Sequence, residues 1–135
     1  MRLLLDTHLV IWIHTNKKML THQVLDIIQN PDNEIFFSSI NIWETQIKYL
    51  KSKEEFPISG DKLFELCRLS GMKCLPVLPE HAVFLKTLSY SSDAPRPHKD
   101  PFDRMLISQT KAENMVSLTH DELLPFYKEP CVILV

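Results

Sequence analysis

The sequence predicts an α/β fold built around a mostly parallel central sheet. Short aliphatic runs alternate along the chain with longer segments whose apolar residues recur at helical spacing. The first run, Leu3-Leu4-Leu5, is continuous, as in strands that are buried on both faces of a parallel sheet. A length of 135 residues is typical of one domain, so we expect residues 1–135 to form a single unit.

Capping residues and a proline set the limits of the elements in the first half of the chain. Asp6 follows the first aliphatic run and can cap the helix expected after it. The second helix should end at Asn30, because Pro31 disfavours a helical conformation of the residue before it. Ser39 is a favourable N-cap for the third helix. We therefore expect strands at residues 2–5 and 34–38, and helices that include residues 9–13, 21–29 and 39–51.

The expected helix at residues 39–51 carries an acidic residue at the border of its apolar face. Its apolar stripe consists of Ile40, Trp43, Ile47 and Leu50. Glu44 stands four residues after Ile40 and three before Ile47, so it should lie beside this stripe. Such a position is informative because a purely solvated glutamate would stand on the opposite face.

Prolines and glycines set the limits of the elements in the second half of the chain. Gly71 and Pro79 flank a short strand, and Pro79 fits the first turn of a helix. Residues 89–99 contain two prolines and no apolar period, which is typical of a loop. Asp100 is the expected N-cap of a helix with Pro101 in its first position. We expect strands at residues 73–77, 115–118 and 131–135, the last at a sheet edge, and helices at residues 61–69, 79–88, 101–113 and, as a short helix or turn, 122–127.

Composition excludes several classes of function. Gly60 and Gly71 are the only glycines, so a glycine-rich phosphate loop cannot be built, and phosphate chemistry would require metal. The net charge of −2 argues against binding of nucleic acid mainly by electrostatic attraction, although nucleic acid can still be a substrate.

The cysteines and the longest apolar run bear on the compartment. Three cysteines without a C-x-x-C pair fit buried thiols in a reducing environment, so we expect a cytoplasmic protein. The longest apolar run, residues 9–13, is too short to span a bilayer, and no membrane partner is expected.

Four carboxylates stand where a strand ends or a helix begins, and the carboxyl ends of parallel strands share one rim of a sheet. They are Asp6, Glu44, Asp103 and Asp121. Two like charges about 4 Å apart repel by about 4 kcal/mol at an effective dielectric constant near 20, so such a cluster requires a cation or protonation. Oxygen ligands without cysteine or histidine at ligand spacing indicate Mg²⁺ or Mn²⁺ and not zinc. If the cluster forms, removing one charge, as in Asp6→Asn, should stabilise the metal-free protein.

Each acid alone also has a structural explanation. Asp6, Asp100 and Asp121 can act as helix caps. Asp103 suits the dipole in the first turn of its helix. Glu44 can pair with Lys48, four residues later. Only the combination favours a metal site.

The motifs around these acids resemble those of PIN-domain proteins, in particular the VapC-type toxins of bacterial toxin-antitoxin pairs. The matching segments are L-L-L-D-T-H at residues 3–8, S-S to W-E at residues 38–44, D-P-F-D-R-M-L-I at residues 100–107 and S-L-T-H-D at residues 117–121. They occur in order over nearly the whole chain. The resemblance implies a three-layer α/β/α fold and a metal-dependent endoribonuclease that hydrolyses RNA with metal-activated water.

The resemblance also implies roles for individual residues and for partners. The four acids match the family's quartet, which binds one or two Mg²⁺ or Mn²⁺ ions, and Thr119 matches the hydroxyl residue that supports the fourth acid. Asp103 is preferred to Asp100 because it stands just before Met105, where the family has its third acid, although Asp100 can contribute through water. The expected partners are RNA as substrate, a small antitoxin protein and a second copy of the chain in a homodimer.

Some alternatives remain open. The basic residues Arg96, His98, Lys99 and Arg104 suit either contacts to RNA phosphates or a solvated loop. A PIN-like interaction module without catalysis is a second possible function. A phosphorylation-dependent receiver domain is disfavoured because Asp6 lacks an acidic neighbour, and a nuclease for structured DNA because the chain has little beyond a minimal domain.

Overall fold

A five-stranded parallel sheet forms the centre of the protein in a computed structural model that describes residues 1–135. The strands are β1 (Arg2–Leu5), β2 (Glu34–Ser38), β3 (Lys73–Leu75), β4 (Val116–Thr119) and β5 (Val132–Leu134). Their order in the sheet is β3-β2-β1-β4-β5, and all four neighbouring pairs are parallel. The predicted parallel sheet is confirmed, and β5 lies at its edge as expected.

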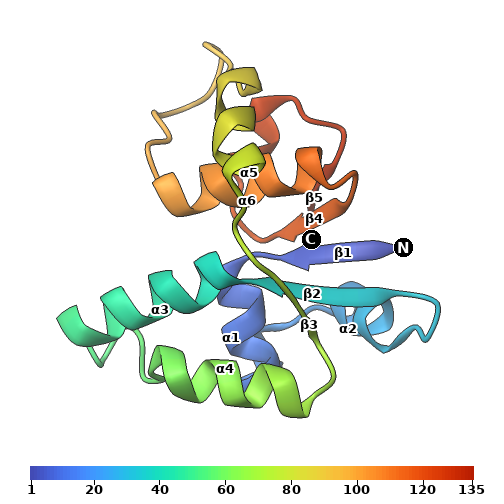
Figure 1. The fold of residues 1–135 in the computed structure, drawn as a ribbon, viewed down its shortest axis with the longest axis vertical. Coiled ribbons are helices and arrows are strands. Elements are labelled where there is room, and N and C mark those ends of the chain that lie inside the picture. The colour runs from blue at the N-terminus through green and yellow to red at the C-terminus, as the bar shows by residue number, and fades with distance from the viewer.

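Helices cover both faces of the sheet and give three layers (Figure 1). One layer contains α1 (Thr7–Thr15), α2 (His22–Gln29), α3 (Ser39–Lys51) and α4 (Gly60–Leu69), and the other contains α5 (Pro79–Phe84) and α6 (Pro101–Ala112). Short 3-10 segments occur at Lys17–Met19, Leu85–Thr87 and Leu124–Tyr127. The predicted α/β/α architecture is confirmed. No helix is both long and apolar enough to cross a membrane.

The first aliphatic run is buried on both faces of the sheet. Leu3 and Leu5 pack into the cluster formed with α1, α2 and α4, whereas Leu4 packs into the cluster formed with α6. All three side chains are fully buried. Alternation of side chains along a strand explains why a continuous leucine run is required here.

The strand order creates a crevice between the carboxyl ends of β1 and β4. From β1 the chain continues to β2 on one side, while β4 lies on the other side, with Leu5 paired to Leu118. In open α/β sheets, ligands bind beyond the strand ends at such a reversal of strand order. Asp6 follows β1 directly and Asp121 follows β4, so the fold brings both acids to this crevice.

Several predicted boundaries are wrong. The N-cap of α3 is Ser38, not Ser39, and Ser38 and Asn41 form a reciprocal capping box. The strand predicted at residues 73–77 ends at Leu75, because Pro76 has no N–H to donate to the ladder. The helix predicted at residues 79–88 ends at Phe84 and continues as a 3-10 turn.

Only part of the apolar stripe predicted on α3 is buried. Trp43 is 58% exposed and Leu50 is 73% exposed, whereas the buried residues of this helix are Ile40, Asn41, Glu44 and Thr45. Glu44 therefore lies on the inner face of α3. This face is partly polar because it borders the crevice at the strand ends as well as apolar neighbours.

The expected burial of all cysteines is corrected as well. Cys67 is buried, Cys131 is half-buried and Cys74 is exposed, and all three have free thiols.

Candidate metal centre

A cavity of about 340 Å³ opens at the carboxyl ends of β1 and β4, and no hydrophobic residue lines it. Six carboxylates line it: Asp6, Glu44, Asp100, Asp103, Asp121 and Glu122. The only lysine and arginine at its wall are Lys48 and Arg96. Carboxylates therefore outnumber these cations three to one, and the cavity has the charge of a cation-binding site.

Asp6 is held in one orientation by hydrogen bonds from α1, from β4 and from the residue that follows β4. Its Oδ1 caps α1 by accepting from the backbone N–H of Leu9 at 2.9 Å. Its Oδ2 accepts from the hydroxyl of Thr119 at 2.7 Å and from the backbone N–H of His120 at 2.9 Å, and His120 Nδ1 lies 3.0 Å away. Burial raises the pKa of Asp6, but His120 and the other donors outweigh burial and hold this pKa below its usual value. Asp6 is therefore an anion in the folded protein.

Glu44 is positioned by α1 and by its own helix. Its Oε1 accepts a hydrogen bond from the Thr7 hydroxyl, which in turn accepts from Asn41 Nδ2 at 3.0 Å. Its Oε2 lies 2.5 Å from Lys48 Nζ. Burial is the largest single effect and lowers the pKa of Lys48, but Glu44, Asp100 and Asp103 together outweigh it and raise this pKa, so the ammonium group is charged. The predicted pair of Glu44 and Lys48 thus forms, and it forms at the wall of the cavity.

The two aspartates of the D-P-F-D motif have different environments. Asp100 Oδ1 caps α6 by accepting from the N–H groups of Phe102 at 2.8 Å and Asp103 at 3.3 Å, as predicted. Asp103 lies in the first turn of the helix, and its pKa is raised to about 6. Burial is the main cause, His98 opposes it, and the charges of Asp100, Glu44 and Asp6 add to the rise. Asp103 is therefore the acid that is least stable as an anion without a cation.

Asp121 presents one oxygen to the cavity. Its Oδ1 accepts from the N–H of Leu123 at 2.8 Å, so it caps the turn that follows, as the structural explanation predicted. Its backbone N–H donates to the hydroxyl of Thr119 at 3.0 Å. Thr119 thus joins Asp6 to Asp121. The other oxygen, Oδ2, lies 3.9 Å from His98 Nε2.

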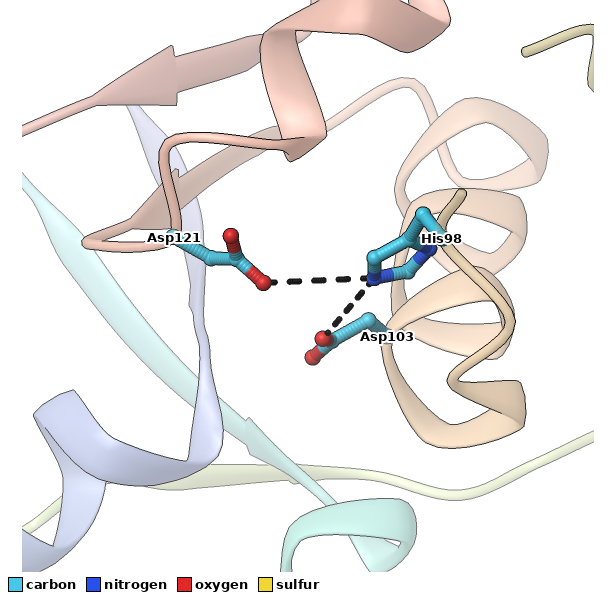
Figure 2. Close-up of side chains that lie close together, drawn as sticks. All are labelled: His98, Asp103 and Asp121. Carbon is cyan, nitrogen blue, oxygen red and sulfur yellow. Dashed lines mark hydrogen bonds and ion pairs between the residues drawn. The ribbon is translucent and has the colours of Figure 1, made fainter. Parts of the chain in front are cut away.

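His98, in the loop before α6, reaches between two of these acids (Figure 2). Its Nε2 lies 3.3 Å from Asp103 Oδ2, and Figure 2 shows the imidazole and both carboxylates pointing toward one another. The ion pair with Asp103 raises the pKa of His98. One ligand atom each from His98, Asp103 and Asp121 lies within 4.8 Å of the others, a spacing that a metal ion can bridge. The expectation that no histidine lies at ligand spacing is therefore wrong, because the fold brings the loop before α6 to the acids, and the donor set fits a divalent cation.

The structure brings together most of the residues predicted from sequence. The four acids of the quartet and Asp100 line one cavity, and Thr119 lies beneath it. Arg104 does not line the cavity, and its Nε is buried without a hydrogen-bond partner. That the quartet binds metal stays a prediction.

The predicted basic cluster does not form one exposed patch. Arg96 is exposed at the cavity and Lys99 is exposed outside it, whereas the His98 side chain is buried against carboxylates. The spacing of basic residues in a loop could not show this difference, because burial there depends on Tyr127, from a distant segment, which packs against the His98 ring.

Sequence reasoning missed the roles of two side chains that line the cavity, Thr7 and His120, and considered His98 only as one of a group of basic residues. Thr7 follows the predicted cap Asp6 in the sequence, and in the structure it orients Glu44 through a hydrogen bond. The signal for His120 was present, because it lies between Thr119 and Asp121 in the motif. The signal for His98 was its place two residues before Asp100, in a loop that must return to the rim.

Comparison with known proteins gives one family and one fold. The family model described as PIN domain matches residues 3–128 of the chain. The chain is similar in structure to VapBC2 from Rickettsia felis bound to a DNA fragment from its promoter, with a TM-score of 0.67, 20% identity, and coverage of 100% of this chain and 98% of that chain. It is also similar to VapBC-1 from nontypeable Haemophilus influenzae, with a TM-score of 0.58, 16% identity, and coverage of 90% of this chain and 87% of that chain. No curated protein sequence matches the chain.

Proposed function

This chain belongs to the PIN-domain family, and we propose that it is a metal-dependent endoribonuclease and the toxin of a toxin-antitoxin pair. The observation that carries the proposal is the cavity at the strand ends, which has six carboxylates and no hydrophobic lining. The similar fold of chains in two VapBC structures supports the toxin assignment. Its substrate is RNA, in which it hydrolyses phosphodiester bonds.

The cofactor of the proposed reaction is Mg²⁺ or Mn²⁺, held by Asp6, Glu44, Asp103 and Asp121. Carboxylate oxygens are the preferred ligands of both ions. When bound, such an ion polarises a phosphate, promotes the deprotonation of water near neutral pH and stabilises the leaving oxygen. The acidic wall repels a phosphodiester, so substrate binding in this cavity depends on the cation.

The side chains around the acids have supporting roles in this proposal. Thr7 and Thr119 fix the orientation of Glu44 and Asp6 through the hydrogen bonds described above. The Lys48 ammonium lies over the ring of Phe56 at 5.2 Å and over that of Phe102 at 5.9 Å, which holds it at the cavity wall. Lys48 and the exposed Arg96 line the cavity, and in this proposal they contact phosphate oxygens of a bound RNA strand.

The proposed partners follow from the same assignment. A small antitoxin protein binds the chain and blocks the acidic cavity, and two copies of the chain form a homodimer. Since RNA and a newly made antitoxin are both present in the cytoplasm, the proposal places the protein there.

Cleavage assays on single-stranded RNA and DNA test the proposed reaction. With Mg²⁺ or Mn²⁺ present, RNA should be cleaved and DNA should not, and EDTA should abolish cleavage because the carboxylates alone cannot bind the phosphate. Cleavage of DNA alone would indicate a different nuclease. Absence of any cleavage with either metal would favour the alternative, an interaction module without catalysis.

Growth of a bacterial host tests the toxin assignment. Expression of the chain should slow growth, and co-expression of its neighbouring small gene should restore it, because a bound antitoxin closes the cavity. The Glu44→Gln variant serves as the control, since it should be harmless when expressed at the same level. A wild-type chain that leaves growth unchanged would contradict the toxin assignment, while the cleavage assay would still test the enzyme.

A further inference from the structure

His98 lies beside Asp103 and Asp121 at the acidic cavity, and an oxygen-only metal site has no place for its imidazole. The His98 side chain is only 4% exposed, although it belongs to a loop and not to a helix or strand. A buried imidazole between two carboxylates, as Figure 2 shows, is costly to place and requires a partner for each ring nitrogen. The partner of each ring nitrogen of His98 therefore bears on how the site binds a metal ion.

We propose that His98 Nε2 is a direct ligand of the metal ion, together with Asp103 and Asp121, and that this nitrogen makes the site prefer Mn²⁺ to Mg²⁺. The proposal rests on the proposed function in one respect, that a divalent cation binds in this cavity. It goes further by assigning a residue outside the acidic quartet and by predicting which of the two ions binds more tightly.

The distances between the three donor atoms fit one ion. Neighbouring ligands of an octahedral ion with bonds of about 2.1 Å are about 3.0 Å apart, and opposite ligands are about 4.2 Å apart. His98 Nε2 lies 3.3 Å from Asp103 Oδ2 and 3.9 Å from Asp121 Oδ2, between these limits. All three donor atoms lie within 4.8 Å of one another, a spacing that a single ion can bridge.

The second nitrogen of His98 is held in the way that metal-binding histidines require. Nδ1 lies 2.7 Å from the hydroxyl of Tyr127, and the two rings pack edge to face at 5.4 Å. Histidine ligands commonly donate the N–H of the non-ligating nitrogen to a fixed acceptor, which sets the tautomer and the direction of the ring. With Nδ1–H donated to Tyr127, the lone pair of Nε2 points at the two carboxylates.

The nitrogen ligand decides between the two candidate ions. Mg²⁺ binds oxygen almost exclusively and keeps several water ligands, so an imidazole adds little to its affinity. Imidazole binds first-row transition ions better than it binds Mg²⁺. Mn²⁺ is one of these ions, although it is the weakest of them in the usual affinity order. A site with one nitrogen and at least two carboxylates therefore binds Mn²⁺ more tightly than Mg²⁺.

The competing explanation is an ion pair without metal contact. In that arrangement the imidazolium donates from Nε2 to Asp103 and stabilises the cavity as a permanent counter-charge. A bound metal would then lie nearer to Asp6 and Glu44, and its ligands would all be oxygen atoms. The two explanations differ in whether a nitrogen is bonded to the ion.

Pulsed electron paramagnetic resonance of Mn²⁺ bound to the wild-type protein decides between them. We expect a coupling to nitrogen that changes to the ¹⁵N pattern when the protein is made with ¹⁵N-labelled histidine. The coupling should disappear in His98→Gln. It should persist in His120→Asn, which tests the histidine beside Asp6, and in His22→Asn, a control at an exposed position on α2. Bound Mn²⁺ without nitrogen coupling in the wild type would overturn the proposal without use of any variant.

Calorimetric titration with Mn²⁺ and with Mg²⁺ measures the predicted preference. His98→Gln should weaken Mn²⁺ binding by about tenfold or more, the range known for residues that tune metal sites, and should change Mg²⁺ binding by less than about threefold. Equal losses for both ions would contradict the proposal. RNA cleavage by a wild type that lacks nitrogen coupling would leave the proposed function standing, whereas a protein that neither binds Mn²⁺ nor cleaves RNA would overturn both.

Discussion

Single replacement of any member of the acidic quartet by its amide should lower the rate of RNA cleavage by more than about 100-fold, because each acid supplies charge or a ligand atom to a shared ion. The four variants are Asp6→Asn, Glu44→Gln, Asp103→Asn and Asp121→Asn. The first-order rate of cleavage of a labelled RNA with saturating metal is the quantity to compare. The variants should also be non-additive, since loss of one ligand already disrupts the site that the others form.

Asp100→Asn is the matched control for this series. Asp100 lines the same cavity but also caps α6 through its Oδ1, and asparagine caps helices equally well. We expect its cleavage rate to stay within about tenfold of the wild type. Full activity of Asp103→Asn together with loss of activity in Asp100→Asn would show that the functional member of the D-P-F-D motif is the first aspartate.

Asp103→Asn should raise the stability of the metal-free protein at pH 7. The pKa of Asp103 is raised from 3.8 to about 6, so the folded protein binds this proton more tightly than the unfolded chain does. Stability contributed by this group is therefore full below pH 4 and is lost as the pH rises toward 6. The difference between 3.8 and about 6 corresponds to about 3 kcal/mol, which the neutral amide should largely recover at pH 7. Urea denaturation in EDTA at pH 4 and pH 7 measures it.

Asp6→Asn should have the opposite effect and is the control for this prediction. The pKa of Asp6 is lowered in the folded protein, so its charge adds stability above the unfolded value of 3.8. An amide at this position turns its NH₂ group toward donors, and the free energy of unfolding should fall. The structure thus reverses the expectation from sequence that Asp6→Asn stabilises the protein. A stabilised Asp6→Asn with an unchanged Asp103→Asn would contradict this distribution of charge.

The fold was largely predictable because its signals are local. The leucine run of β1, the cap at Asp100 and the proline in the first turn of α6 each act within a few residues. The convergence of the quartet was also predictable, because parallel strands place their carboxyl ends at one rim. Pro76 is a local signal that the predicted strand limits did not take into account, since β3 ends just before it and two residues before the predicted limit.

The chemistry of the individual acids could not be predicted in the same way. Which acid is stable as an anion depends on donors from other elements, such as Thr119 and His120 for Asp6. Burial of His98 depends on its contact with Tyr127, which is 29 residues away in the chain. These contacts exist only after the sheet has formed, so no spacing in the sequence encodes them.

Thermal denaturation of the wild type and of Asp103→Asn, each with EDTA and with Mg²⁺ or Mn²⁺, tests the shared metal site most directly. We expect metal to stabilise the wild type, by about 2.7 kcal/mol when the ion is at a hundredfold excess over its dissociation constant. We expect little stabilisation of Asp103→Asn, because one ligand is lost, although this variant is the more stable protein in EDTA. Identical melting of the wild type with EDTA and with either metal would contradict the claim that these acids form a divalent-metal site.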